Sequence, residues 1–147
     1  MFGRIVVGTD GSNTASEAVR QATELAKTMG AKLDIVSAYE PIPQDRIREE
    51  KTEAPGDVQY AINPREDVDL ALKAASGPAK EAGVEYKLHP REGDPADAIL
   101  DVAEERDSDL IVVGNKGMTG AKRFLLGSVP NKVSHHAPCS VLIVRTT

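Results

Sequence analysis

The chain has no tryptophan, only two phenylalanines and three tyrosines, and one cysteine among its 147 residues. So few aromatic rings argue against a stacking surface for single-stranded nucleic acid. The lone Cys139 cannot form an intrachain disulfide, which favours a reducing compartment. Every apolar run is far shorter than the roughly 18 residues that span a bilayer. We therefore expect a cytoplasmic protein that binds neither nucleic acid nor membranes.

Basic side chains are also in the minority, with 18 Lys and Arg against 23 Asp and Glu, so the formal net charge is −5. An acidic chain is poorly suited to coat nucleic acid or an anionic membrane, although a local basic patch is compatible with it. Residues 1–4 lead directly into an apolar run without a signal-peptide pattern. The length and the 40% hydrophobic content predict a single globular domain over residues 1–147.

Short apolar runs rich in β-branched residues alternate with amphipathic stretches along the chain. A run that is apolar throughout, such as 5–7 or 110–113, is typical of a parallel strand buried on both faces. The run 84–88 instead alternates with period two, which indicates an edge strand. The alternation of strands and helices predicts an α/β fold with an open parallel sheet and helices on both faces. The expected strands are 5–7, 33–39, 84–88, 110–113 and 141–144.

Several helix ends can be read from the sequence. Ser12 or Asn13 can cap the first helix, and Gly30 is placed to end it. Gly77 and Pro78 interrupt a helical stripe, so that helix is expected to be kinked or split. Asp94 and Pro95 form an N-cap followed by proline at the first helical position. In the first helix, helical spacing predicts one apolar face made of Ala15, Ala18, Val19, Ala22, Leu25, Ala26 and Met29.

Residues 40–65 differ from the rest, because they contain four prolines and many charges without a clear period. This composition predicts a long surface loop inserted into the domain. Loops of this length are uncommon in compact domains, so the insertion is either a functional lid or partner surface, or a variable solvated segment.

The chemistry of the chain is concentrated in residues 114–129, which follow the buried run 110–113. Gly114, Gly117, Gly127 and Ser128 have the spacing G-x2-G-x9-G-S. Glycines let the backbone approach phosphate oxygens, and the free N–H groups of a helix expected to open near Pro130 favour negative charge. The candidate phosphate contacts through charge are Lys116, Lys122 and Arg123. The alternative is an ordinary glycine-containing surface loop.

Other polar residues fall at the same edge of the predicted sheet. Residues 9–10, 37–38 and 114–115 follow three different strands, and ligands of open parallel sheets bind at the carboxyl ends of strands. The chain contains neither the Walker A pattern nor the dinucleotide pattern G-x-G-x-x-G. We therefore expect a nucleotide crevice that holds phosphates through residues 114–129.

Four segments together resemble nucleotide-binding universal stress proteins. They are I-V-V-G-T-D-G-S at 5–12, V-G-N-K-G at 113–117, L-L-G-S-V at 125–129 and H-A-P-C-S-V-L-I-V at 136–144. The resemblance covers nearly the whole chain. It implies a Rossmann-like five-stranded parallel sheet of order 3-2-1-4-5. The spacing G-x2-G-x9-G-S separates the family members that bind nucleotide from those that do not.

The resemblance also implies roles for particular residues. Asp10 would face the ribose or a Mg²⁺ ion bound to the phosphates, and Val36 and Ala38 would bracket the adenine. Two departures weaken the phosphate site: Lys116 replaces a residue that is often Arg or His, and Pro130 has no N–H to donate. The other nucleotide-binding positions implied by the family are Gly8, Thr9, Gly114, Asn115, Gly117, Gly127, Ser128 and Val129.

The resemblance implies a regulator gated by ATP that acts as a homodimer in the stress response. One alternative is a cyclic AMP-binding sensor, a second is a slow ATPase, and a third is a structural dimer that uses residues 40–65 to contact a partner. We expect no enzyme activity beyond weak ATP hydrolysis, because no general base, nucleophile and orienting group are assembled. Residues implied at the dimer interface are Val141, Leu142, Ile143, Val144 and Arg145.

The histidines and the cysteine do not form a metal-binding pattern. His135 and His136 are adjacent, so they point in different directions on a helix, and no second cysteine or carboxylate is spaced to complete a site with Cys139. We expect Cys139 to be a small buried residue. His89 is isolated in the sequence and is expected at the surface.

Overall fold

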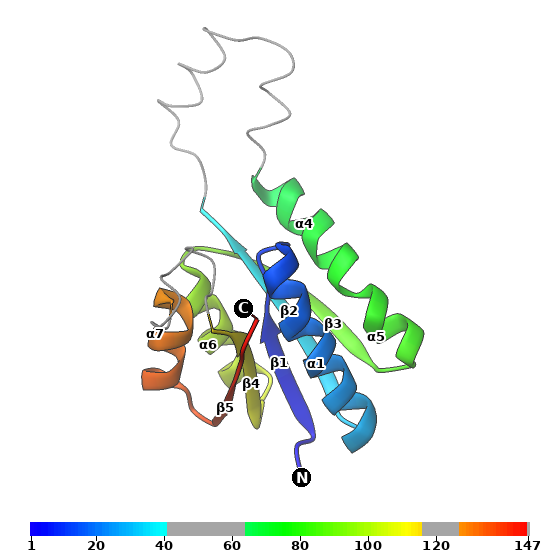
Figure 1. The fold of residues 1–147 in the computed structure, drawn as a ribbon. Coiled ribbons are helices and arrows are strands. Elements are labelled where there is room, and N and C mark those ends of the chain that lie inside the picture. The colour runs from blue at the N-terminus through cyan, green and yellow to red at the C-terminus, as the bar shows by residue number, and fades with distance from the viewer. Residues whose placement is uncertain (41–63, 116–126, 147) are drawn as a thin grey trace, which may run out of the picture.

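The computed structural model describes residues 1–40, 64–115 and 127–146. Five parallel strands form one sheet of order β3-β2-β1-β4-β5, which confirms the expected fold class and strand order (Figure 1). The edges of the sheet are therefore β3 and β5. The strands are β1 (Arg4–Gly8), β2 (Lys32–Tyr39), β3 (Tyr86–Glu92), β4 (Leu110–Gly114) and β5 (Ser140–Val144).

Helices cover both faces of the sheet (Figure 1). Three of them, α1 (Asn13–Met29), α4 (Pro64–Ala75) and α5 (Gly77–Ala82), share a core with Ile5, Val7 and other residues of the same sheet face. The other two, α6 (Pro95–Glu105) and α7 (Ser128–His136), pack against the face that carries Val6. The two cores together make a three-layer α/β domain. No helix among the described residues is both long enough and apolar enough to cross a bilayer.

The helix ends confirm several sequence-based predictions. The Ser12 side chain accepts a hydrogen bond from the Ala15 N–H at 3.2 Å, and Gly30 ends α1 in the left-handed conformation with φ 65°. The predicted split lies between α4 and α5, at Ser76. Asp94 caps α6 by accepting from the Asp97 N–H at 3.0 Å. Of the apolar face expected on α1, Ala18, Val19, Ala22 and Ala26 are buried, Ala15 and Leu25 are partly buried, and Met29 is 38% exposed.

Three element boundaries differ from expectation. Strand β3 begins later than predicted and continues to Glu92, because it pairs with β2 as far as Tyr39. Pro90 is tolerated inside β3 because the strand is at an edge, where one row of N–H groups has no partner strand. Helix α7 begins at Ser128, before Pro130. The predicted insertion ends earlier than expected, since Pro64 and Arg65 belong to α4, and its residues 41–63 lie outside the described part of the chain.

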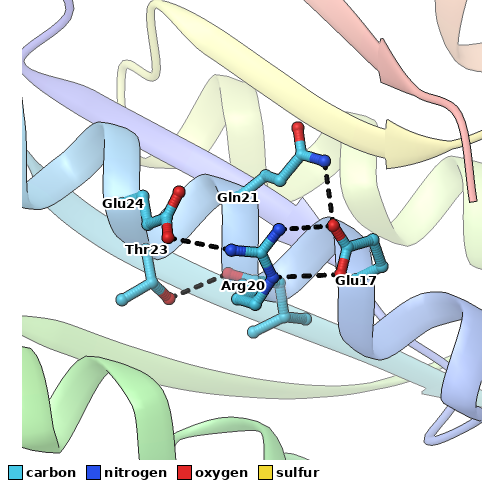
Figure 2. Close-up of polar contacts among 6 residues, drawn as sticks. Glu17, Arg20, Gln21, Thr23 and Glu24 are labelled. Atoms are coloured by element: carbon cyan, nitrogen blue, oxygen red, sulfur yellow. Dashed lines mark hydrogen bonds and ion pairs between the residues drawn. The ribbon is translucent and has the colours of Figure 1, made fainter.

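The outer face of α1 is covered by an ion-pair network centred on Arg20 (Figure 2). Its guanidinium donates to both carboxylate oxygens of Glu17, at 2.6 and 3.0 Å, and to Glu24 at 2.8 Å. The hydrogen bonds from Arg20 and then from Gln21 lower the pKa of Glu17 from 4.5 to about 2. These groups are in contact with water, so the network adds little to the stability of the fold. It fixes the solvent-facing side of α1.

A buried polar cluster lies beneath α6, and it corrects the expectation for His89. His89 is only 5% exposed, because it faces the α6 side of the sheet together with Asp34 of β2, which is 1% exposed. The His89 Nε2 and Asp34 Oδ1 atoms are 2.7 Å apart, and Arg106 Nε donates to the same oxygen at 3.2 Å. Burial acts to raise the pKa of Asp34, but the hydrogen bond from His89 and the charge of Arg106 outweigh it, so this pKa lies below its ordinary value. Asp34 is therefore a carboxylate held inside the fold by its partners.

Removing one partner of the Asp34–His89 pair should destabilise the protein more than removing both. His89→Leu leaves the buried Asp34 carboxylate without its closest partner, so we expect the free energy of unfolding to fall by about 3 kcal/mol. The double variant Asp34→Leu/His89→Leu removes both polar groups, and we expect it to lie within about 1 kcal/mol of the parent. Urea unfolding of His89→Leu, Asp34→Leu and the double variant measures the coupling between the two side chains.

The Asp34–His89 pair also makes the stability of the fold depend on pH. Because the pKa of Asp34 is lowered in the folded state, its contribution to stability is present above the ordinary value of 3.8 and is lost as the pH falls through the lower folded-state pKa. The double variant should lose this acid-dependent component. Equal acid sensitivity in the parent and the double variant would contradict the assignment.

Candidate functional site

A small pocket lies where β1 and β4 end and where α1 and α7 begin. The site is at the carboxyl edge of a parallel sheet, between the central strand β1 and its neighbour β4, where the strand order changes direction. Two helix N-termini border it, so two helix dipoles place partial positive charge there. The residues that line it are Gly8, Thr14, Ala15, Val113, Gly114, Val129 and Thr146.

The N-terminus of α7 presents backbone N–H groups that the helix itself leaves without acceptors. Gly127 is its N-cap and has no side chain that could cap the helix, and the first helical bond runs from the Asn131 N–H to the Gly127 carbonyl at 3.1 Å. The N–H groups of Ser128 and Val129 therefore have no acceptor inside the helix. Pro130 supplies no N–H, as its sequence implied. Ser128 is exposed, so its N–H and hydroxyl are available to a ligand at the surface.

The end of β1 is built as a tight turn. Thr9 is buried, its N–H donates to the Val36 carbonyl at 2.9 Å, and its Oγ1 accepts from the Gly11 N–H at 3.1 Å. Asp10 is exposed, and its Oδ1 accepts from the Ser12 N–H at 2.9 Å. One oxygen of Asp10 thus shapes the turn into α1, while the other can accept from a ribose hydroxyl or bind a cation. The family-based role of Asp10 stays a prediction.

The two residues expected to bracket adenine have different environments. Val36 is 1% exposed and packs in the core with Val113 and Val129, and its carbonyl already accepts from Thr9. Ala38 lies further toward the carboxyl end of β2, on the same face, and is only partly buried. Ala38 is therefore the better placed of the two to touch a base.

Asn115 joins three parts of the site. Its N–H donates to the Val144 carbonyl at 2.8 Å, and its carbonyl accepts from the Gly127 N–H at 3.0 Å. Its side-chain Oδ1 accepts from the N–H and the hydroxyl of Thr146, at 2.9 and 3.0 Å. The end of β4, the start of α7 and the chain after β5 are thereby held together. Thr146 was missed by sequence reasoning, because only the strand order places the chain after β5 beside Gly114.

The structure brings most of the predicted site residues to one edge of the sheet. Gly8 and Gly114 line the pocket, Val129 borders it from α7, and Thr9, Asp10, Asn115, Gly127 and Ser128 belong to the segments that surround it. The predicted nucleotide-binding position Gly117 and the predicted phosphate contacts Lys116, Lys122 and Arg123 lie outside the described residues.

The histidines at the end of α7 and the following cysteine lie outside this pocket. His135 and His136 are exposed, and Cys139 is partly buried rather than fully buried, packing against the α6–α7 core. Burial, with a smaller contribution from Asp109, raises the pKa of the Cys139 thiol. A raised pKa leaves the thiol protonated and poorly nucleophilic at neutral pH.

This open α/β sheet, with glycines and helix N-termini at its carboxyl edge, has the architecture of a nucleotide-binding fold. The model of the universal stress protein family matches residues 1–145, and the chain belongs to this family. Universal stress protein Rv1636 of Mycobacterium tuberculosis is 39% identical over 144 residues, which is 97% of this chain and 96% of the relative. Universal stress protein MJ0531 of Methanocaldococcus jannaschii is 34% identical over 99% of this chain and 83% of its own length.

Solved structures of relatives include nucleotide complexes. A universal stress protein in complex with cAMP is 36% identical, with a TM-score of 0.75 and coverage of 99% of both chains. The universal stress protein from Archaeoglobus fulgidus in complex with dAMP is 25% identical, with a TM-score of 0.68 and coverage of 97% of this chain and 98% of its own. Members of the family with this fold therefore bind adenine nucleotides.

Gly114 is expected to tolerate no side chain without a shift of Thr146. A Cβ atom at Gly114 would lie 3.3 Å from Thr146 Cγ2, so Gly114→Ala should push Thr146 away from Asn115 and lower the free energy of unfolding by about 1 kcal/mol. Gly77→Ala is the matched control, since a Cβ there meets nothing within 4 Å, and it should be neutral or stabilising. Urea unfolding measures the free energy of unfolding of both variants. Equal effects would mean that the contact with Thr146 does not constrain residue 114.

Proposed function

We propose that this protein binds an adenine nucleotide at the pocket between β1, β4, α1 and α7, and acts as a nucleotide-gated regulator with ATP as its ligand. The observation that supports this most directly is the start of α7, where the N–H groups of Ser128 and Val129 have no acceptor within the helix and Gly127 offers no capping side chain. Phosphate oxygens are suitable acceptors there. Gly8 and Gly114 allow close approach of a ligand from the other side.

Cyclic AMP is the second candidate ligand. A relative 36% identical to this chain was solved in complex with cAMP, and Pro130 removes an N–H that a longer phosphate chain could have used. A cyclic monophosphate carries one negative charge, so it needs fewer cationic partners than ATP. The affinity for ATP should therefore depend more on the basic residues of the 114–129 segment than the affinity for cyclic AMP does.

The choice between ATP and cyclic AMP is tested by the double variant Lys122→Gln/Arg123→Gln. If ATP is the ligand, loss of two charges near its phosphates should weaken Mg-ATP binding at least about tenfold and cyclic AMP binding less than about threefold. Calorimetric titration of nucleotide-free protein with each ligand measures both affinities. Lys73→Gln is the control, because Lys73 is an exposed cation on α4, outside the pocket residues.

Two results would change the assignment. Tighter binding of cyclic AMP than of ATP by the parent, with little effect of the double variant, would make cyclic AMP the ligand. Failure of the parent to bind either nucleotide would remove the proposed function and favour a dimer that works through protein contacts alone.

We also propose that nucleotide is bound without rapid turnover. Asp10 is the carboxylate that follows β1, and it is exposed and hydrogen-bonded to the turn at Ser12 rather than to a histidine or a nucleophile. Multiple-turnover phosphate release should stay at the background rate and should be unchanged in Asp10→Ala. Release well above background that disappears in Asp10→Ala would instead support the ATPase alternative.

The protein is further proposed to act in the cytoplasm as a homodimer that pairs through β5. This strand contacts β4 on one side and forms an edge of the sheet on the other, with Leu142 37% exposed. An apolar edge strand invites pairing with another strand. The interface would consist of Val141, Leu142, Ile143, Val144 and Arg145.

A charge at the β5 edge should weaken such a dimer. Leu142→Lys places an ammonium group in the proposed interface, so we expect the dimer dissociation constant to rise at least about tenfold. Leu70→Lys is the control, because Leu70 is 62% exposed on α4, a helix on the α1 face that is not paired with β5. Analytical ultracentrifugation over a concentration series compares the two. A parent protein that is monomeric at all concentrations would rule out this interface.

A further inference from the structure

The bonds of Asn115 suggest a role different from ligand contact. A backbone N–H can only donate, so the Thr146 N–H fixes which end of the Asn115 amide faces it: the oxygen, Oδ1. That oxygen also accepts from the Thr146 hydroxyl. The acceptor end of Asn115 is thus used to hold the segment after β5.

The main chain of Asn115 extends the same connection to the anion-binding helix. Its N–H is bonded to Val144, the last residue of β5, and its carbonyl is bonded to Gly127, the N-cap of α7. Residues 115 and 127 flank residues 116–126. The hydrogen bond between the Gly127 N–H and the Asn115 carbonyl fixes the distance between these two flanking residues. The position of Gly127 determines where the N–H groups of Ser128 and Val129 lie.

Thr146 is held from a second direction as well. A Cβ atom added at Gly114 would lie only 3.3 Å from Thr146 Cγ2. The methyl group of Thr146 therefore packs directly on Gly114. Thr146 also lines the pocket. Its hydroxyl and its methyl group thus have separate tasks, one bonding Asn115 and the other packing on the end of β4.

We propose that Asn115 and Thr146 form a latch that positions the N-terminus of α7, so that ligand affinity depends on the segment leaving the β5 edge. Asn115 and Thr146 are positioning residues in this account. The ligand part of the inference rests on the proposed nucleotide binding, whereas the positioning of α7 can be measured without any ligand. Since the latch begins at the end of β5, the same bonds connect the nucleotide pocket to that edge of the sheet.

The latch is tested with three variants in the full-length protein. Asn115→Ala removes the acceptor of both Thr146 bonds, Thr146→Val removes the hydroxyl and keeps the shape, and Thr146→Ser keeps the hydroxyl and removes the methyl group. Ser134→Ala is the control, because Ser134 is an exposed residue of the last turns of α7 whose hydroxyl donates to the Asn131 carbonyl. Thr146→Val is conservative enough to keep the test usable if Asn115→Ala does not fold.

The first measurement is amide hydrogen exchange at Gly127 in ligand-free protein. We expect the exchange to accelerate about tenfold in Asn115→Ala and about threefold in Thr146→Val, and to change little in Thr146→Ser and Ser134→Ala. The second measurement is calorimetric affinity for Mg-ATP and cyclic AMP, which should weaken in the same order. The latch is supported if the variants rank in the same order in hydrogen exchange at Gly127 and in nucleotide affinity.

Three outcomes separate the alternatives. Weaker binding in Asn115→Ala with unchanged exchange at Gly127 would make Asn115 a direct ligand contact and overturn the latch. Unchanged exchange and unchanged affinity in all variants would overturn it too. Accelerated exchange in a protein whose parent binds neither nucleotide would uphold the positioning of α7 and reject the proposed function.

Discussion

The site depends on the backbone N–H groups at the start of α7, which the helix itself cannot satisfy. The parallel sheet aims α7 and α1 at the same edge, so their dipoles add at the pocket between Gly8, Gly114 and Val129. Because Gly127 cannot cap the helix with a side chain and Pro130 has no N–H, the available donors are those of Ser128 and Val129. An anion bound at this point would complete the hydrogen bonding of the helix.

The rest of the fold holds this helix end in place. The apolar residues of α7, Val129 and Val133, are buried with Val36 and Val113 in the core of the α6–α7 face. Lys132 bonds Asp97 at 2.9 Å, which joins α7 to the first turn of α6. Asn115 then connects α7 to β4 and to the end of β5. A ligand that prefers this arrangement would shift the population of any alternative one, and this is the physical basis for a nucleotide-gated regulator.

Most of the fold was predictable because its signals are local. Buried β-branched runs, the Ser12 and Asp94 caps and the break at Gly77 each depend on neighbouring residues, while the strand order came from family resemblance. His89 was assigned wrongly because its burial comes from a partner, Asp34, that is adjacent only across the β2–β3 pairing. Thr146 was missed for the same reason, since it follows β5 and its neighbour Gly114 ends β4. The glycine and serine positions of the site were readable from their spacing, but the bonds that position them were not.

Nucleotide binding at the start of α7 is tested most directly by mapping backbone amide shifts by NMR as cyclic AMP and then Mg-ATP are added to nucleotide-free protein. If the nucleotide binds there, the largest shifts should fall on Ser128, Val129 and Gly8, because their amides surround the pocket. Shifts confined to the groove between α1 and α4, around Leu70 and Ala74, would contradict this site by placing the ligand away from the N-terminus of α7.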